Sequence, residues 1–405
     1  MYLSFAWRYF RAKKSANAIN IIAWVTTTVI AFATCCQILV LSVFNGFEGL
    51  VKSLYSSFYS DLRVEPAKGK TFTLSQSQIA NISTQSFVAG ISMIAEEKAL
   101  LQNGESQTVV SLKGVDENYK HISGVASHIS EGKFETGDVD VPKIVAGYGV
   151  QNAASISISE GMPPMVITVI LPKKTMNADA ADAMSEGNAT TAGIFSIQQD
   201  IDNQYAVTNI DFVKSQMGFG IDEFSAAEIK LKGTADPKKG QRALEKILGN
   251  NFEVKTRYQQ NANLYRTMRL EKWAIYAILT LILIIAAFNM VSALTMLVLE
   301  KRKDISILRS MGTTKTGIQK IFLGEGLLLG IIGAACGISL AFILLLLQIK
   351  FQFIKIQGGS FLIDYFPVKM IATDFLMVAA TAIFIAFLAS WFPAYKAAGQ
   401  DIELK

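Results

Sequence analysis

The residue types that usually carry covalent chemistry are scarce in this chain and are not spaced for catalysis. Its two histidines, His121 and His128, are seven positions apart in a polar segment, where solvated or capping roles are more common than paired metal ligation. The stretch 312–317 begins like a phosphate-binding loop, but Ile318 and Gln319 follow where that loop needs a lysine and a hydroxyl. The sequence therefore predicts no catalytic centre, metal site or nucleotide site in this chain.

The three cysteines offer no site either. Cys35 and Cys36 are adjacent, Cys336 lies far away, and all three fall within apolar stretches. This spacing fits neither a zinc site nor a disulfide framework. A domain outside the membrane would then depend on its hydrophobic core.

The most regular charged pattern is LEKRKDISILRSMGTTKTGIQKIF, residues 299–322, between two long apolar runs. With Ile305 set at 0° and about 100° per residue, Ile307, Leu308 and Met311 fall within about 200–300°, whereas most basic and serine side chains gather at about 40–160°. This periodicity predicts an amphipathic helix that ends at the glycine after Met311. Two interpretations remain open: a helix lying at the lipid headgroups, or a helix docked in a groove of a cytoplasmic partner.

Composition indicates a protein that is partly in lipid and partly in water. The 405 residues are 51% hydrophobic and 18% charged, with a mean hydropathy of +0.34. Crossing a hydrocarbon core takes about 20 apolar residues, and four stretches are long enough: 20–44, 273–299, 321–347 and 375–395. The sequence predicts a membrane α-helical protein with four transmembrane helices and a large α+β extracytoplasmic domain, residues 45–270, inserted between the first two.

Lysine and arginine flank the predicted spans unevenly. They are concentrated in residues 1–19 and 300–320, whereas the loop 348–374 has only three lysines. The positive-inside rule places both basic segments and the 396–405 tail in the cytoplasm, and the 45–270 domain outside. The first span is too long for a cleaved signal peptide, so we expect it to remain as an anchor. The net charge of +5 reflects this topology and does not indicate nucleic-acid binding.

The extracytoplasmic domain is predicted to fold from two halves, about 60–114 and 226–257, around an inserted subdomain at about 115–225. Extended runs flank the Asn-Gly dipeptide at 103–104, which is the strongest short signal for a β-hairpin. Residues 175–191 are small, polar and rich in alanine. They predict an exposed loop or a mobile arm.

Small and polar residues within the predicted spans indicate helix packing. Four glycines of the third span have small-xxx-small spacing: Gly326, Gly330, Gly333 and Gly337. They permit close approach of helices, either within the chain or across a dimer. Glu325 lies about one turn into that span, where we expect its carboxylate to reach water or Lys320. Gln37 and Asn289 are expected to form hydrogen bonds between helices.

Taken together, these motifs resemble the permease subunits of bacterial lipoprotein-releasing ABC transporters, within the broader FtsX/MacB-type family. That family's N-terminal elbow, first span and following helix are similar to LSFAWRYFRAKKSANAINIIAWVTTT and VLSVFNGFEGLV. Its second span, coupling helix and third span are similar to FNMVSALTMLVLEKRKDISILRSMGTTKTGIQKIFLGEGLLLGIIGAACG, and its C-terminal signature to WFPAYKAAGQDIELK. The similarity covers the four spans well and the outside domain more loosely.

The resemblance implies that two permease subunits pair, as a homodimer or a heterodimer, in the bacterial inner membrane. Each would dock on a separate cytoplasmic ATPase that holds ATP and magnesium, so this chain would be a non-catalytic subunit without a cofactor. The docking surface would be the coupling helix and its flanks: Glu300, Lys301, Arg302, Lys303, Asp304, Ile305, Ile307, Leu308, Arg309, Met311 and Gly312.

The resemblance also implies a triacylated lipoprotein substrate and a soluble periplasmic carrier that receives it. Position in the sequence suggests five residues that would line a lipid cavity between the first two spans: Val43, Phe44, Phe47, Leu264 and Met268. The family member that recruits the carrier uses a projecting hook, and the nearest counterpart here is 171–193. Its alanine-rich composition departs from an apolar hook.

Two alternatives remain open at this point. One is a MacB-type exporter, a class that usually carries its ATPase in the same chain. The other is an FtsX-type mechanotransmitter that regulates a periplasmic cell-wall hydrolase, a class that usually has a shorter external domain. The motif VLSVFNGFE favours lipoprotein release over both.

Overall fold

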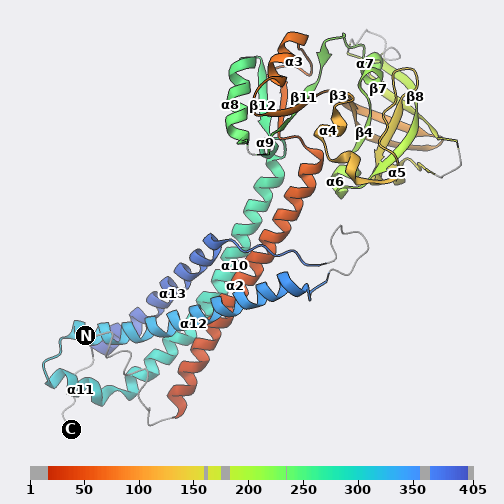
Figure 1. Cartoon of the computed structure of the whole chain (residues 1–405). Coiled ribbons are helices and arrows are strands. Elements are labelled where there is room, and N and C mark those ends of the chain that lie inside the picture. Colours follow the sequence, from red (N-terminus) through yellow and green to blue (C-terminus); the bar gives the residue numbers. More distant parts are fainter. Residues whose placement is uncertain (1–16, 159–162, 175–182, 234, 356–364, 400–405) are drawn as a thin grey trace. The chain divides into compact units, whose positions relative to one another are not determined.

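The structure of the chain is a computed structural model (Figure 1), which describes residues 17–158, 163–174, 183–233, 235–355 and 365–399. The chain divides into two compact units. The helical unit comprises Met1–Leu50 and Arg266–Lys405, and the sheet unit comprises Val51–Tyr265.

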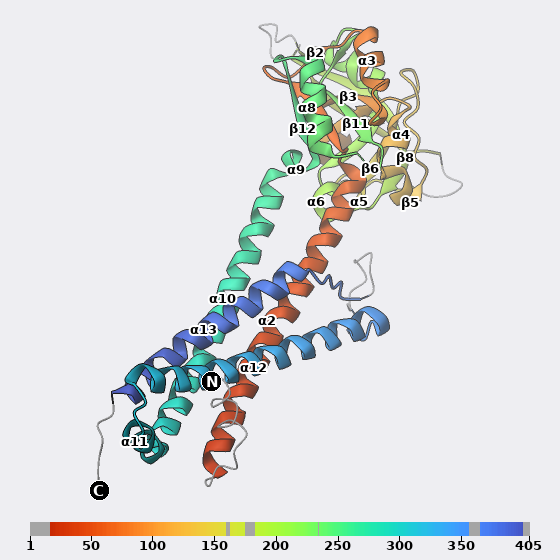
Figure 2. The same cartoon turned by 60° about the vertical axis from the view of Figure 1, so that its left-hand side comes forward.

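Most of the helical unit consists of four long helices and one short helix of the described chain, which Figures 1 and 2 show. They are α2 (Asn17–Phe58), α10 (Ala262–Glu300), α11 (Arg302–Ser310), α12 (Lys315–Phe351) and α13 (Ala372–Ala398). The last turns of α2 and the first residues of α10 belong to the sheet unit. All four long helices are long and apolar enough to cross a membrane.

The helix α12 packs closely on two neighbours through its glycines. These are Gly326, Gly330, Gly333 and Gly337, of which the first two approach α13 and the last two approach α2. A Cβ atom on Gly330 would lie 2.3 Å from the Cβ atom of Ala386, and one on Gly337 would lie 2.3 Å from the Ala31 carbonyl oxygen. Since no side chain fits at such distances, glycine is what permits these two crossings. Of the two alternatives left open by the sequence, the structure shows packing within the chain.

The sheet unit is built on a ten-stranded sheet in the described residues, with the order β12-β1-β11-β3-β4-β9-β6-β8-β5 and with β7 paired to β3 and β8. Its strands are β1 (Leu62–Pro66), β3 (Val88–Asn103), β4 (Ser106–Val115), β5 (Ile129–Gly132), β6 (Lys143–Gly147), β7 (Val166–Pro172), β8 (Met184–Phe195), β9 (Tyr205–Asn209), β11 (Ala226–Leu231) and β12 (Phe252–Thr256). A second, two-stranded sheet pairs β2 (Phe72–Thr73) with β10 (Glu223–Phe224).

Short helices connect these strands and cover the sheet (Figure 1). They are α3 (Gln76–Ser83), α4 (Tyr119–Ile122), the 3-10 helix η1 (Val125–His128), α5 (Tyr148–Ala153), α6 (Gln199–Asp202), α7 (Ile210–Met217), α8 (Pro237–Leu248) and α9 (Arg257–Gln260). With a mixed sheet and helices between the first and second membrane-length helices, the predicted fold class is confirmed.

The inserted segment 115–225 does not form a sheet of its own. Its strand β9 pairs in parallel with β4, with Ser111 opposite Tyr205. Its strand β7 pairs antiparallel with β3, with Leu100 opposite Ile170. The insert therefore extends the sheet of the two flanking halves, and the predicted inserted subdomain shares that sheet. The sequence did not predict this sharing, because strand pairing between segments distant in sequence leaves no local pattern.

Local sequence explains the two best-defined connections of the sheet unit. Strands β3 and β4 form the predicted hairpin, with Asn103 opposite Ser106 and Gly104 at φ +57°, a backbone conformation that glycine adopts without strain. The helix α8 begins at Pro237, whose missing N–H is harmless there, and the Asp236 side chain accepts from the Lys238 amide.

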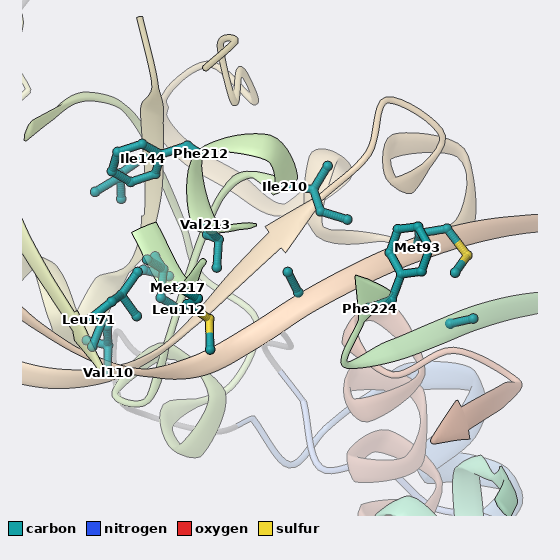
Figure 3. Packing of buried hydrophobic residues seen from close by; sticks show 14 of the residues in the cluster. Met93, Val110, Leu112, Ile144, Leu171, Ile210, Phe212, Val213, Met217 and Phe224 are labelled. Carbon is teal, nitrogen blue, oxygen red and sulfur yellow. The ribbon is translucent and has the colours of Figure 1, made fainter. Parts of the chain in front are cut away.

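The main core of the sheet unit lies where α7 packs on the sheet. Figure 3 shows Val213 and Met217 of α7 beside Leu112 and Val110 of β4, and all four side chains are buried. On the same strand, a Cβ atom at Gly114 would come within 2.8 Å of the Val213 side chain. The glycine thus lets α7 approach the sheet closely.

Residues 175–191 are only partly the loop that the sequence predicted. From Met184 onward they form β8, which pairs with β7, so the prediction is wrong for this part. The alternation of buried and exposed side chains along β8 explains the small polar composition. Residues 175–182 lie outside the described residues. The proposed hook counterpart, 171–193, is thus built largely on the β7–β8 pair.

Candidate functional site

The connection between α10 and α12 forms a short, separately capped helix. The helix α10 ends at Glu300, Lys301 precedes α11, and Met311 follows it. Gly312 has φ +91°, which terminates the helix as expected for a glycine at this position. The side chain of Thr314 then accepts from the Gly317 amide and begins α12. The loop that begins like a phosphate site therefore caps a helix.

One apolar side chain of α11 is buried against the other helices of the helical unit. Ile305 is 2% exposed and packs with residues from α10, α12 and α13, namely Leu297, Val298, Ile318, Phe322, Ala394 and Ala397. Ile305 therefore holds α11 on the helical unit. Its place in the predicted docking surface is corrected accordingly, because a partner cannot reach a side chain that is already buried.

The opposite side of α11 presents apolar side chains to the surroundings. Ile307 is 59% exposed and Met311 is 78% exposed, whereas Leu308 is half-buried. The same connection carries charged side chains, of which the Lys301 ammonium lies 3.0 Å from the Asp304 carboxylate. The connection therefore presents two exposed apolar side chains beside charged ones. The other predicted coupling residues also lie in this connection: Glu300, Arg302, Lys303, Arg309 and Gly312.

A polar cluster joins three helices of the helical unit. The Asn45 amide of α2 donates to Oδ2 of Asp374 at 2.6 Å, and the Lys272 ammonium of α10 donates to the same carboxylate at 3.0 Å. Lys272 also donates to Oδ1 of Asn45 at 2.9 Å. Asp374 lies in the first turn of α13 and is buried. Sequence reasoning missed this cluster, although a lysine and an aspartate directly precede the second and fourth predicted spans.

Replacing Asp374 with alanine is expected to lower the free energy of unfolding by about 1.5–3 kcal/mol, because Lys272 and Asn45 both lose a charged acceptor. Thermal unfolding of the solubilised chain measures the change. Glu271→Ala is a matched control, since Glu271 is an exposed carboxylate next to Lys272 on α10. If both variants unfold at the same temperature, the cluster does not stabilise the helical unit.

The five residues predicted to line a lipid cavity are divided between the two units. Val43, Phe44, Phe47 and Met268 are half-buried in the helical unit, and the Phe47 ring packs edge-on against Phe366 with centroids 5.7 Å apart. Leu264 belongs to the sheet unit and lines a cavity there with a volume of about 530 Å³. Leu264 lies one helical turn before Met268 on α10, so these two predicted residues are neighbours on one helix.

The remaining polar residues of the predicted spans behave differently from one another. Gln37 donates from its side-chain amide to the Thr280 hydroxyl at 3.1 Å, which confirms the predicted hydrogen bond between α2 and α10. Asn289 is instead exposed on α10. Glu325 is buried, so the prediction that it reaches water is wrong. The close approach of α12 to α13 through the neighbouring Gly326 explains this burial.

The histidines do not come together. His128 places Nδ1 2.8 Å from the Gly124 carbonyl oxygen within η1, and the His121 carbonyl oxygen accepts from the Lys230 ammonium. Across the described ranges, no group of three or more His, Cys, Asp or Glu side chains is arranged to hold a metal ion.

Charge is buried in the centre of the sheet unit, which sequence reasoning also missed. The Lys113 ammonium of β4 donates to Oε1 of Glu228 on β11 at 2.6 Å, and both side chains are almost fully buried, at 1% and 0% exposed. Arg63 of β1 donates to the same oxygen at 2.9 Å and to Glu96 at 2.8 Å. Burial alone would raise the pKa of Glu96, but Arg63 and Lys113 outweigh it and hold that pKa below its ordinary value.

Comparison with known proteins supports a relationship over both units. Residues 276–402 match the family model described as FtsX-like permease C-terminal. The chain is 27% identical over 400 residues to the lipoprotein-releasing system transmembrane protein LolC of Xylella fastidiosa (strain 9a5c), covering 96% of this chain and 95% of that protein. It is 26% identical over 413 residues to the lipoprotein-releasing system transmembrane protein LolE of Haemophilus influenzae, covering 97% and 96%. These matches confirm the resemblance predicted from the sequence motifs.

Among solved structures, the periplasmic region of MacB from Actinobacillus actinomycetemcomitans is similar to this chain. The identity is 14% and the TM-score is 0.37, with 54% of this chain and 98% of that one covered.

Proposed function

We propose that this homologue of lipoprotein-releasing transmembrane proteins is a permease subunit of an ABC transporter. It would extract triacylated lipoproteins from the outer leaflet of the bacterial inner membrane and pass them toward a periplasmic carrier. The observation that carries the proposal is the extent of the homology, which includes the sheet unit as well as the helices. The helices alone would fit any protein with an FtsX-like permease domain.

Extraction of a lipoprotein needs an external source of free energy. Each CH₂ group withdrawn from the bilayer costs about 0.8 kcal/mol, so three acyl chains do not leave spontaneously. In the proposed complex, a separate ATPase supplies this energy by hydrolysing ATP with magnesium. Two copies of the ATPase would serve two permease subunits, one of them this chain.

The ATPase would contact α11. The support for this is the exposed apolar pair, Ile307 and Met311, combined with the buried Ile305 that fixes α11 to the helical unit. A helix held in this way transmits a push to α10, α12 and α13 through packed side chains. On this proposal the basic segments are cytoplasmic and the sheet unit is periplasmic, as the positive-inside rule predicts.

The acyl chains would be held against apolar residues near the outer ends of the first two spans. Val43, Phe44, Phe47 and Met268 are the residues proposed for this contact, and their partial exposure supports it. Leu264 is proposed with them, since it lies one turn before Met268 on α10, and it also lines the cavity of the sheet unit.

A release assay tests the proposal. The chain is co-expressed with its ATPase and any sister permease, reconstituted with a labelled triacylated lipoprotein, and supplied with ATP and a soluble carrier. We expect ATP-dependent transfer of the lipoprotein to the carrier. ATP hydrolysis without transfer of any of several lipoproteins would contradict the proposal. It would favour the alternative of a mechanotransmitter that regulates a cell-wall hydrolase, or, if a drug or peptide is exported, a MacB-type exporter.

A further inference from the structure

The sheet unit contains a polar cavity that the helices and their coupling surface do not explain. Its volume of about 530 Å³ lies within the range of about 300–1,000 Å³ that is usual for ligand sites. Three segments meet there: the end of α2, the α6–β9 connection and the α9–α10 junction. The lining residues are Tyr55, Tyr59, Asp200, Ile201, Gln204, Tyr205, Gln259, Gln260, Asn261, Ala262, Asn263 and Leu264.

This cavity lies where the chain enters and leaves the sheet unit. The unit begins at Val51 and ends at Tyr265, so Tyr55 is four residues from one boundary and Leu264 is next to the other. By chain connectivity, both lining segments continue into membrane-length helices, α2 and α10. The cavity is therefore formed in part by the first and last segments of the sheet unit, which continue along the chain into α2 and α10.

The aromatic rings of the cavity are held by one another. The rings of Tyr55 and Tyr59 are stacked with centroids 5.8 Å apart, and the Tyr205 ring lies 4.5 Å from that of Phe58. The Tyr55 hydroxyl donates to Oδ2 of Asp200 at 3.1 Å. These contacts cover one face of the Tyr55 and Tyr59 rings and hold both rings in place. What they contribute to the cavity is a rigid wall.

The hydrogen-bonding groups of the cavity are mainly side-chain amides. Gln259 is fixed because its Oε1 accepts from the Thr256 amide at 2.8 Å, and Gln260 donates to the Ser60 carbonyl oxygen at 3.2 Å. Gln204 and Asn263 are exposed on the rim. An amide both donates and accepts, which matches the alternating N–H and C=O groups of an extended polypeptide.

The lining argues against an anionic ligand. Among the lining residues that the structure describes, Asp200 is charged and none is lysine or arginine. Phosphate groups are usually bound by arginine, lysine or clustered backbone N–H groups, so a phospholipid headgroup fits this cavity poorly. Amide contacts to a peptide backbone do not read its side chains, and they suit a protein that handles several different polypeptides.

We infer that this cavity binds an extended polypeptide segment, namely the first residues of the lipoprotein that follow its lipid-modified end. The inference rests on the proposed function, because on that function the substrate polypeptide begins at the bilayer, and two of the segments that line the cavity continue along the chain into membrane-length helices. The rim amides of Gln204 and Asn263 hold the backbone of the segment, and the fixed tyrosine wall with Gln259 and Gln260 limits its path.

Photo-crosslinking in the complete complex tests this inference. Asn263 or Gln204 is replaced with p-benzoylphenylalanine, and the complex is reconstituted with its ATPase and a labelled triacylated lipoprotein. The matched control carries the same group at Asn250, an exposed amide in the α8–β12 loop that does not line the cavity. We expect adducts with the first residues of the lipoprotein polypeptide at the two rim positions and none at the control.

A second measurement uses variants that keep the fold. Gln204→Ala combined with Asn263→Ala removes two exposed amides and is expected to slow ATP-dependent transfer about five- to tenfold, since two hydrogen bonds to the substrate are lost. ATP hydrolysis should be unchanged, and Asn250→Ala should transfer lipoprotein at the normal rate.

The outcomes separate this inference from the proposed function. If the unmodified complex transfers lipoprotein but the rim positions crosslink only to phospholipid, or to no polypeptide, the inference is overturned and the proposed function stands. Normal transfer by the double variant also overturns it. If the unmodified complex hydrolyses ATP and transfers no lipoprotein, the proposed function fails and this inference fails with it.

Discussion

Replacing Ile307 and Met311 together with aspartate is expected to abolish ATP-dependent transfer while the chain stays folded. Both side chains are exposed, so the fold loses little when they change. An apolar contact at the centre of an interface typically contributes about 2 kcal/mol or more. Two charges placed there should weaken binding of the ATPase by more than about a hundredfold. Co-purification of the ATPase with the tagged chain, followed by the release assay, measures both effects.

Two further variants make this result interpretable. Ile221→Asp places the same charge at an isoleucine that is 90% exposed on the sheet unit, and it should leave ATPase binding unchanged. Ile305→Ala removes a buried side chain and should destabilise the helical unit by about 2–5 kcal/mol. If the double aspartate variant still binds the ATPase and transfers lipoprotein, α11 does not couple the two proteins, and a helix lying at the headgroups becomes the better interpretation.

The division of α11 into an inner and an outer face could be predicted only in part. The 3.6-residue period placed its apolar side chains correctly on a helix, and Gly312 marked the end. The sequence did not predict that Ile305 is covered and Ile307 is exposed, because the cover comes from three other helices, α10, α12 and α13, the last of them almost ninety residues away. Periodicity reports which residues share a face, and burial depends on what packs against that face.

The same limit applies to the two buried charge clusters. The four spans and the β3–β4 hairpin depend on local sequence patterns, and these patterns predicted both. Asn45 and Asp374, by contrast, lie 329 residues apart, and Lys113 sits 115 residues from Glu228. Within β4, Lys113 resembles any polar residue of a strand with one solvated face. Only the pairing of β4 with β3, and of β3 with β11, brings Lys113 to a buried carboxylate.

The buried pair of Lys113 and Glu228 should therefore be the most sensitive point of the sheet unit. Glu228→Gln keeps the shape of the side chain and leaves the Lys113 ammonium buried against a neutral amide. Breaking one partner of a buried ion pair typically costs about 3–5 kcal/mol. We expect a loss of this size, measured in the full chain by thermal unfolding and by faster amide hydrogen exchange in β3, β4 and β11.

Two controls distinguish a buried charge from a general effect of losing a carboxylate. Glu253→Gln removes an exposed partner of Lys255 and should cost less than about 1 kcal/mol. The double variant Lys113→Met with Glu228→Leu removes both charges and should recover most of the stability, because no ion is then left without its counter-charge. Equal losses for Glu228→Gln and Glu253→Gln would contradict this account.

Acid titration is an independent test of the same network. The direction in which the free energy of unfolding changes with pH follows from the pKa of Glu96. Arg63 and Lys113 outweigh the effect of burial and hold the Glu96 pKa below its ordinary value in the folded state. The unfolded chain then binds more protons than the folded chain as the pH falls below that ordinary value. Glu96 therefore makes its full contribution to the free energy of unfolding above the ordinary pKa of a glutamate. This contribution is lost as the pH falls through the lower pKa of the folded state. Arg63→Met should shrink this acid-dependent loss of stability, because without the guanidinium the folded and unfolded pKa values of Glu96 move together.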